Sequence, residues 1–160
     1  MKKTLTDWAN VAEIIGAFAI VLSLIFVGVQ IRENTRAAQN ATFQQSVSQE
    51  LGIFQALSAL DREALLRWNE YRLGPGLDAN QVQADPANML FLAGVRLWEN
   101  MYLQYQSGAL AEWAWASREP TIRAWLLGPR IEVMLDSGVL TAEFAAYVRE
   151  VRSEAGLGTP

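Results

Sequence analysis

The polar side chains that could do chemistry gather in one stretch, "RLWENMYLQYQSG", residues 96–108. Arg96, Glu99 and Asn100 fall within one helical turn, and Gln104 follows one turn after Asn100. In one interpretation this polar cluster forms a pocket that holds an anionic or amide-bearing ligand. In the other it is structural: Arg96 pairs with Glu99 at i,i+3, and the two amides bond to loop carbonyls. The spacing favours the structural interpretation.

Other parts of the chain offer few groups for catalysis. The sequence has no cysteine and no histidine, which excludes thiol catalysis, cysteine-ligated metals and the usual acid/base group near neutral pH. It also lacks a P-loop, a GxGxxG fingerprint, an HExxH motif and an EF-hand loop. The net charge of −4 gives no basic footprint for nucleic acid. We therefore expect no enzyme activity, no cofactor, no metal and no nucleic-acid partner.

The most informative stretch is an apolar run, "EIIGAFAIVLSLIFVGVQIRENTR", residues 13–36, which carries no charge between Ile14 and Ile31. A helix needs about 20 apolar residues to cross a bilayer, and this run meets the lower end of that range. A cleaved signal peptide fits poorly because Asp7 and Glu13 interrupt it and no small-x-small cleavage site follows. A soluble core helix fits poorly because the run is apolar all round. We predict a transmembrane helix over residues 8–31.

Residues at the two ends of this helix are suited to the membrane interface. Trp8 stands where an aromatic anchor is expected, and Arg32 and Arg36 follow the run as headgroup contacts would. Membrane lipid is therefore an expected partner. Lys2 and Lys3 balance the two arginines, so the positive-inside rule leaves both orientations open.

Small side chains recur along one side of the apolar run. This small-residue stripe has steps of four, three and four residues, and a glutamine continues it one heptad later: Ala12, Gly16, Ala19, Ser23 and Gln30. Small residues let two helix backbones approach closely in lipid, and an amide near the membrane edge can bond across the contact. We predict that the stripe packs against a helix of another membrane protein or of a second copy in a homo-oligomer. The alternative is chance, since such residues are common in spans.

The rest of the chain has helical spacing and few β-branched residues. We predict a helical bundle over residues 32–155, with its first helix continuous with the span to about Leu60, and a frayed tail over 156–160. Asp61 and Thr141 are predicted N-caps, and the loop over 74–84 is followed by Asp85–Pro86, a further start signal. The fold class is therefore all-α: a single N-terminal transmembrane helix continuing into a long helix, then a small bundle.

Two regions of the bundle leave alternatives open. Pro120 predicts a break between a helix over 110–117 and another through Leu126, because proline disrupts a helix interior. Trp113 and Trp115 are two residues apart and so point to different faces of a helix. An exposed tryptophan would suit a partner or the membrane interface, but core packing is the favoured interpretation.

Two sets of residues resemble the motifs of an uncharacterised family of small bacterial single-span membrane proteins. The first set lies in the span and its exit: Gly16, Ser23, Leu24, Gln30, Ile31, Asn34 and Thr35. The second lies in the central helix: Asn100, Tyr102, Gln104, Tyr105, Gly108 and Leu110. Phe26 stands where members of the family often have tyrosine. The resemblance implies a single-pass protein of the bacterial inner membrane with a cytoplasmic C-terminal domain, and it implies no activity.

Two functions follow as hypotheses. The first is a membrane-anchored accessory or scaffold subunit that packs through its span and bundle against a larger membrane complex, such as a respiratory, photosynthetic or transport complex. The alternative is a membrane-anchored sensor or ligand-binding module that uses a polar pocket on the central helix.

Overall fold

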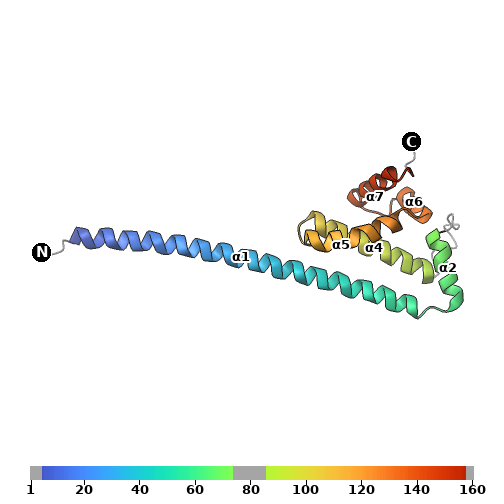
Figure 1. The fold of residues 1–160 in the computed structure, drawn as a ribbon, viewed down its shortest axis with the longest axis horizontal. Coiled ribbons are helices and arrows are strands. Elements are labelled where there is room, and N and C mark those ends of the chain that lie inside the picture. Colours follow the sequence, from blue (N-terminus) through green and yellow to red (C-terminus); the bar gives the residue numbers. More distant parts are fainter. Residues whose placement is uncertain (1–4, 74–85, 158–160) are drawn as a thin grey trace. The chain divides into compact units, whose positions relative to one another are not determined.

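The computed structural model describes residues 5–73 and 86–157, and in these ranges every regular element is a helix (Figure 1). A long N-terminal helix followed by a helical bundle is therefore confirmed. The chain divides into two compact units, Met1–Ala38 and Gln39–Pro160. The described residues of the first unit all belong to one helix, and the second unit contains the core.

Helix α1 (Leu5–Ser58) runs without interruption through the predicted span and beyond it. Its continuity follows from the sequence, because the first proline of the chain is Pro75. The helix ends close to the predicted Leu60, where the N–H of Ala59 is shared between the carbonyls of Gln55 and Ala56. The apolar run and the first helical segment of the bundle therefore belong to one continuous helix.

Helix α2 (Arg62–Leu73) begins as predicted at Asp61. The Asp61 carboxylate accepts the backbone N–H of Ala64 at 2.8 Å, which satisfies one of the free N–H groups of the first turn. The predicted loop over 74–84 and the predicted N-cap Asp85 lie outside the described residues.

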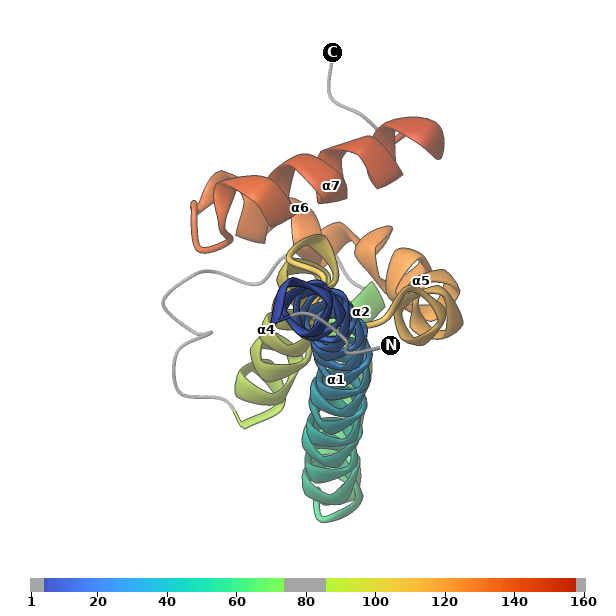
Figure 2. The same cartoon turned by 90° about the vertical axis from the view of Figure 1, so that its left-hand side faces the viewer.

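Helix α4 (Pro86–Gln106) is the central helix of the bundle, and α2, α5 and α7 all pack against it (Figures 1 and 2). The turn that follows it contains Gly108, which takes a φ of +75° that residues with a Cβ avoid. The side chain of Gln39 on α1 donates to the Gly108 carbonyl at 3.1 Å. This bond ties the turn after α4 to the start of the second unit.

Helix α5 (Glu112–Leu126) corrects the prediction at Pro120, because it is one helix with the proline inside it. Pro120 cannot donate to the carbonyl of Ala116, but both residues are exposed, so water can satisfy that carbonyl. The buried side chains of Trp115, Ile122 and Leu126 hold both halves of the helix to the core. Tertiary packing therefore outweighs the local preference for a break.

Two short helices complete the bundle, α6 (Pro129–Asp136) and α7 (Ala142–Glu154). Pro129 opens α6 at the position where a missing N–H costs nothing. Thr141 caps α7 as predicted, since its hydroxyl oxygen accepts the N–H of Phe144 at 3.4 Å. Of the predicted frayed tail, Gly156 and Leu157 are described and exposed, and residues 158–160 lie outside the described residues.

The core of the second unit draws on every helix from α1 to α7 that the structure describes. Its largest fully buried side chains include Phe144, Ile122, Leu126 and Ile131. Helix α1 adds partly buried residues that pack against this cluster: Phe43, Ile53 and Leu57. Burial of each large apolar side chain contributes about 1.5–3 kcal/mol to the free energy of unfolding.

Candidate functional site

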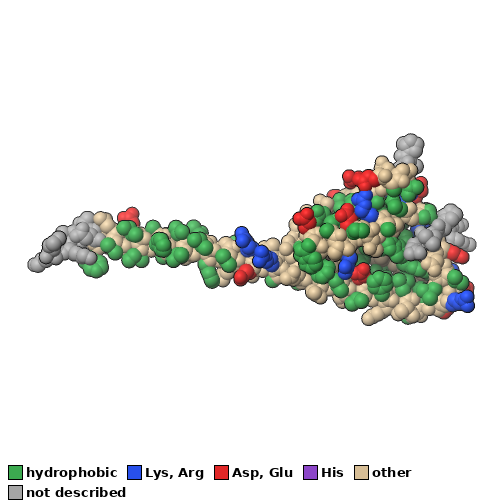
Figure 3. All heavy atoms as spheres, viewed as in Figure 1, with side chains coloured by type: hydrophobic (Ala, Val, Ile, Leu, Met, Phe, Trp, Pro, Cys, Tyr) green, Lys and Arg blue, Asp and Glu red, His purple; other side chains and the backbone are tan. Residues whose placement is uncertain are grey.

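The apolar run of α1 is exposed along its whole length within the chain. The helix is long and apolar enough to span a membrane, and none of its most apolar window is buried against the rest of the protein. Figure 3 shows apolar side chains spread along this stretch of the helix up to a group of charged ones. Exposed apolar surfaces of this extent are typical of contact with a membrane or with another protein.

All members of the small-residue stripe are exposed on α1: Ala12, Gly16, Ala19, Ser23 and Gln30. A Cβ placed on Gly16 would meet no atom within 4 Å. Glycine in a helix interior costs about 1 kcal/mol relative to alanine, and nothing in this chain requires it there. The stripe is therefore open for close contact with another helix.

The predicted interface anchors are all exposed as well. Trp8 stands before the apolar run, and Arg32 and Arg36 follow it on the same helix. Between the two arginines, the hydroxyl of Thr35 donates to the Ile31 carbonyl at 2.9 Å, a common way for threonine to bond within a helix. Thr35, one of the residues that follow the span, therefore has a local structural role.

The structure brings Arg96 and Glu99 together and directs Glu99 towards α7. Arg96 Nη1 lies 2.5 Å from Glu99 Oε2, which is the pairing expected at i,i+3. Glu99 Oε1 accepts the backbone N–H of Thr141 at 2.6 Å. Only 4% of Glu99 is exposed, so its carboxylate is satisfied within the bundle.

The charge of Glu99 is stabilised despite its burial. Burial would raise the pKa of this carboxyl, but the hydrogen bonds from the Thr141 backbone and from Arg96 outweigh it and lower the pKa. Glu99 is therefore an ionised acceptor at neutral pH and not a poised proton donor.

The two amides of the polar cluster lie apart from this arrangement. Gln104 Nε2 donates weakly to Asn100 Oδ1 at 3.4 Å, and Asn100 is exposed. The backbone carbonyl of Gln104 accepts the N–H of Leu110 at 2.9 Å and so closes the turn after α4. The four side chains thus do not converge on one pocket: Glu99 caps a helix, and Gln104 belongs to the helix end.

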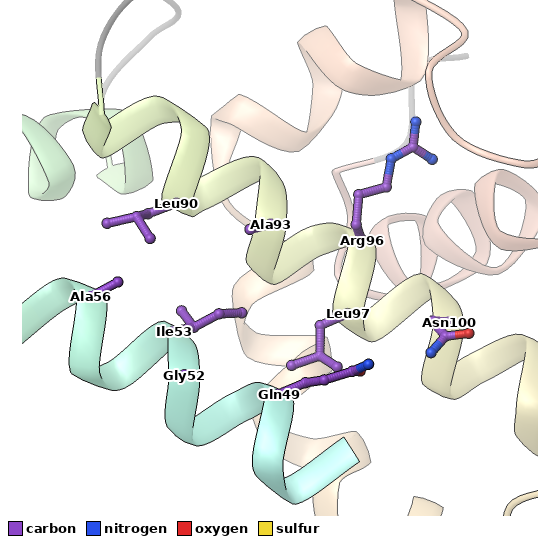
Figure 4. Close-up of a pocket in the computed structure, with 9 residues that line it drawn as sticks. All are labelled: Gln49, Gly52, Ile53, Ala56, Leu90, Ala93, Arg96, Leu97 and Asn100. Atoms are coloured by element: carbon purple, nitrogen blue, oxygen red, sulfur yellow. The ribbon is translucent and has the colours of Figure 1, made fainter. Parts of the chain in front are cut away.

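A groove between α1 and α4, with a volume of about 450 Å³, takes in part of the polar cluster (Figure 4). It is lined by small, apolar and polar residues of the two helices: Gln49, Gly52, Ile53, Ala56, Leu90, Ala93, Arg96, Leu97 and Asn100. Figure 4 shows the Arg96 guanidinium pointing away from α1, whereas Gln49 and Asn100 lie at one end of the groove. The groove therefore presents amides and apolar walls, while its arginine is paired with Glu99.

Buried charges that the sequence did not single out hold the ends of the short helices. Arg152 of α7 is buried and donates to the carbonyls of Leu126 and Gly128, at 3.2 and 3.1 Å. Its other nitrogen pairs with Glu132 at 3.2 Å. Arg130 is buried too and donates to Asn88 at 2.8 Å. Both arginines donate hydrogen bonds to oxygen atoms inside the bundle. No residue spacing in the sequence predicts these contacts.

The tryptophan pair divides as its spacing predicts. Trp115 is 4% exposed and stacks on Tyr105, with ring centroids 5.4 Å apart, whereas Trp113 is 58% exposed and contacts the edge of Phe43. The core interpretation therefore holds for Trp115 but not for Trp113. Tyr102 stacks on Tyr147 at 4.6 Å, so the tyrosines of the central-helix motif serve the core.

In the part of the chain that the structure describes, no three carboxylates come together. We compared the chain with protein-family models, curated proteins and solved structures. None of them matches it.

Proposed function

We propose that the chain is a single-span, membrane-anchored accessory or scaffold subunit of a larger complex in the bacterial inner membrane. Residues 8–31 would cross the bilayer, with Trp8 at one interface and Arg32 and Arg36 at the other. The bundle would lie on the cytoplasmic side, as the family resemblance implies. The proposal names no pathway; respiratory, photosynthetic and transport complexes all fit it.

The observation that carries this proposal is the complete exposure of the apolar run within the chain. Large apolar surfaces of this kind mark contact with a membrane or with another protein. The open stripe at Gly16 supports a second contact within the bilayer, because helices in lipid associate by close packing of small residues. The satisfied charges of the bundle support a structural role over a catalytic one.

Purification of the full chain in a mild detergent, followed by mass spectrometry, tests the accessory role. We expect another membrane protein to co-purify in a fixed ratio and to be lost in harsher detergent. If the wild-type chain purifies without any other membrane protein, the accessory role is overturned.

The α1–α4 groove favours a second candidate function, the binding of a small amphiphile. An apolar ligand could lie over Gly52, Ala56 and Ala93 with an amide-bonding head group at Gln49 and Asn100. This ligand class differs from an anion, because Arg96 already pairs with Glu99.

A thermal-shift screen of fatty acids and fatty amides tests this second candidate. We expect a stabilising amphiphile to lose its effect in Ala93→Leu, which fills the groove, and to keep it in Met89→Leu, an exposed control on the same helix. No shift with any amphiphile, or an equal shift in both variants, would remove the groove as a binding site.

A further inference from the structure

A small cavity lies between helices α1, α2, α4 and α5 of the bundle unit, beside the α1–α4 groove. Three tryptophans from three different helices line it: Trp68 of α2, Trp98 of α4 and Trp125 of α5. Helix α1 contributes Glu50 to the same lining. This space, with a volume of about 80 Å³, is called the tryptophan cavity below. Its rings come from distant parts of the chain, so no spacing in the sequence predicts it.

The three rings adjoin one another at steep angles. The ring centroids of Trp98 and Trp125 are 5.4 Å apart, and their planes meet at 54°. Those of Trp68 and Trp125 are 5.9 Å apart, with an angle of 52°. Tilted rings leave part of each face uncovered, whereas parallel stacked rings cover each other's faces. The tryptophan cavity is therefore bounded by aromatic rings on adjoining sides.

The lining of this cavity is suited to a cation. The faces of aromatic rings carry negative partial charge, and tryptophan attracts cations most strongly. Glu50 adds a carboxylate, whose Oε2 pairs with Arg118 at 3.1 Å. Arg118 does not line the cavity, and its guanidinium lies over the Phe43 ring, 5.6 Å from the ring centroid. The cavity is therefore lined by negative charge, while the nearest arginine is held outside it.

The hydrogen-bonding groups of the lining select the kind of cation. A primary ammonium has three N–H donors, each of which needs an acceptor when it is buried. Among the side chains that line the cavity, Glu50 and Thr121 offer acceptors, whereas the tryptophans can only donate. A quaternary ammonium has no N–H group, and clustered aromatic rings are the usual means of recognising it. We propose that the tryptophan cavity binds the quaternary ammonium head of a choline-like molecule.

The size and the opening of the cavity agree with this ligand. An apolar cavity of about 150 Å³ holds a benzene ring, so about 80 Å³ suits a more compact group such as trimethylammonium. Phe54 of α1 and Thr121 of α5 also line the cavity, and both are exposed. The head can therefore enter from the surface between these two helices, and the rest of the molecule stays outside. Free choline and the head group of a choline lipid present the same ion to this opening.

Titration of the purified full chain with choline, followed by tryptophan fluorescence, tests the proposal. The detergent is an uncharged maltoside, which brings no ammonium group of its own. The matched ligand is the neutral analogue of choline in which carbon replaces the charged nitrogen. We expect choline to bind at least about tenfold more tightly than this analogue, because only the cation is attracted by the rings. Equal affinity for the two would assign the cavity to neutral apolar groups and overturn the proposal.

Two glycines provide variants that keep the fold. A Cβ on Gly94, which lines the cavity, would lie 4.0 Å from the Trp98 ring, an ordinary contact. Gly94→Ala therefore narrows the cavity without displacing a ring, and we expect it to weaken choline binding at least about tenfold. Gly52→Ala is the matched control, because Gly52 lines the neighbouring groove and a Cβ there meets no atom within 4 Å. Equal affinity of the two variants for choline would count against the cavity as the site.

The carboxylate has its own pair of variants. Glu50→Gln removes the charge from the lining, whereas Arg118→Gln breaks the same ion pair and leaves the carboxylate in place. We expect Glu50→Gln to weaken choline binding about threefold or more, and Arg118→Gln not to weaken it. Equal weakening by both variants would contradict a cation site.

A short-chain phosphatidylcholine, titrated separately, distinguishes the two sources of the head group. Saturation by free choline would assign a soluble ligand, and saturation by the lipid alone would assign a membrane lipid; either result supports the chemistry of the cavity. Failure of both ligands to bind would overturn the proposal. The accessory role does not depend on this outcome, because co-purification with another membrane protein decides it.

Discussion

The backbone N–H of Thr141, which caps α7, donates a 2.6 Å hydrogen bond to the buried carboxylate of Glu99 on α4. In a capping box this acceptor comes from a glutamate three residues into the same helix. That position in α7 is Phe144, whose side chain is fully buried in the core. The central helix therefore supplies the missing half of the cap, and Glu99 links the two helices.

Replacement of Glu99 is expected to destabilise the bundle. In Glu99→Ala the backbone N–H of Thr141 loses its charged acceptor, which costs about 2–3 kcal/mol in the free energy of unfolding. Arg96→Ala serves as the control. The Arg96 side chain is 46% exposed, and loss of such a pair costs about 1 kcal/mol or less. Urea unfolding of the full chain in detergent, followed by circular dichroism, measures both; equal losses would contradict the role given to Glu99.

Acid is expected to weaken the bundle through the same carboxylate. The pKa of Glu99 is lowered in the folded protein, from an ordinary value of 4.5. Its stabilising contribution is therefore complete above that value and is lost as the pH falls through the folded pKa. We expect the urea midpoint to fall further between pH 7 and pH 3 in wild type than in Glu99→Gln. A parallel fall in both proteins would exclude Glu99 as the titrating group.

Arg152 is expected to matter more than its neighbour on α7. Arg152→Met removes the donor to the Leu126 and Gly128 carbonyls at the end of α5, which should cost about 2–4 kcal/mol. Arg149→Met changes an exposed side chain and should cost at most about 0.5 kcal/mol. The same urea titration compares them. If Arg152→Met behaves like Arg149→Met, the buried arginine does not hold these helix ends.

The two glycines of the span, Gly16 and Gly28, allow a controlled test of the small-residue stripe. Neither Gly16 nor Gly28 has an atom within 4 Å of an added Cβ, so leucine fits at both in the isolated chain. Gly16 belongs to the stripe and Gly28 does not. We expect Gly16→Leu to weaken association of the span at least about tenfold, or about 1.4 kcal/mol, and Gly28→Leu to leave it unchanged. Native gels of mildly solubilised membranes report the assembled fraction; equal assembly of the two variants would exclude the stripe as the contact.

Much of the fold could be predicted from local signals. Continuity of α1 followed from helical spacing without proline, and the starts of α2 and α7 followed from Asp61 and Thr141, whose side-chain oxygens cap the next turn. The break expected at Pro120 was wrong, because burial of Trp115 and Ile122 on either side keeps α5 in one piece. Local preference decides a helix end only where packing does not oppose it.

The candidate site was harder to predict because its contacts are distant in sequence. The Arg96–Glu99 pair lies within one turn and could be expected from spacing. The bond from Thr141 to Glu99 joins residues 42 apart, and the bond from Arg152 to Leu126 joins residues 26 apart. No periodicity in the sequence predicts such pairs. The contacts of Arg152 and the bond from Thr141 to Glu99 are therefore known only from the packed helices.

Labelling of single cysteines in intact and opened membrane vesicles tests the central claim, that α1 crosses the bilayer between Trp8 and Arg32. The variants are Ala9→Cys, Ser23→Cys and Ala38→Cys, probed with a membrane-impermeant maleimide. We predict that Ala9→Cys and Ala38→Cys react from opposite sides of the membrane and that Ser23→Cys does not react until the membrane is dissolved. Reaction of Ala9→Cys and Ala38→Cys from the same side, or of Ser23→Cys in intact vesicles, would contradict a membrane-spanning α1.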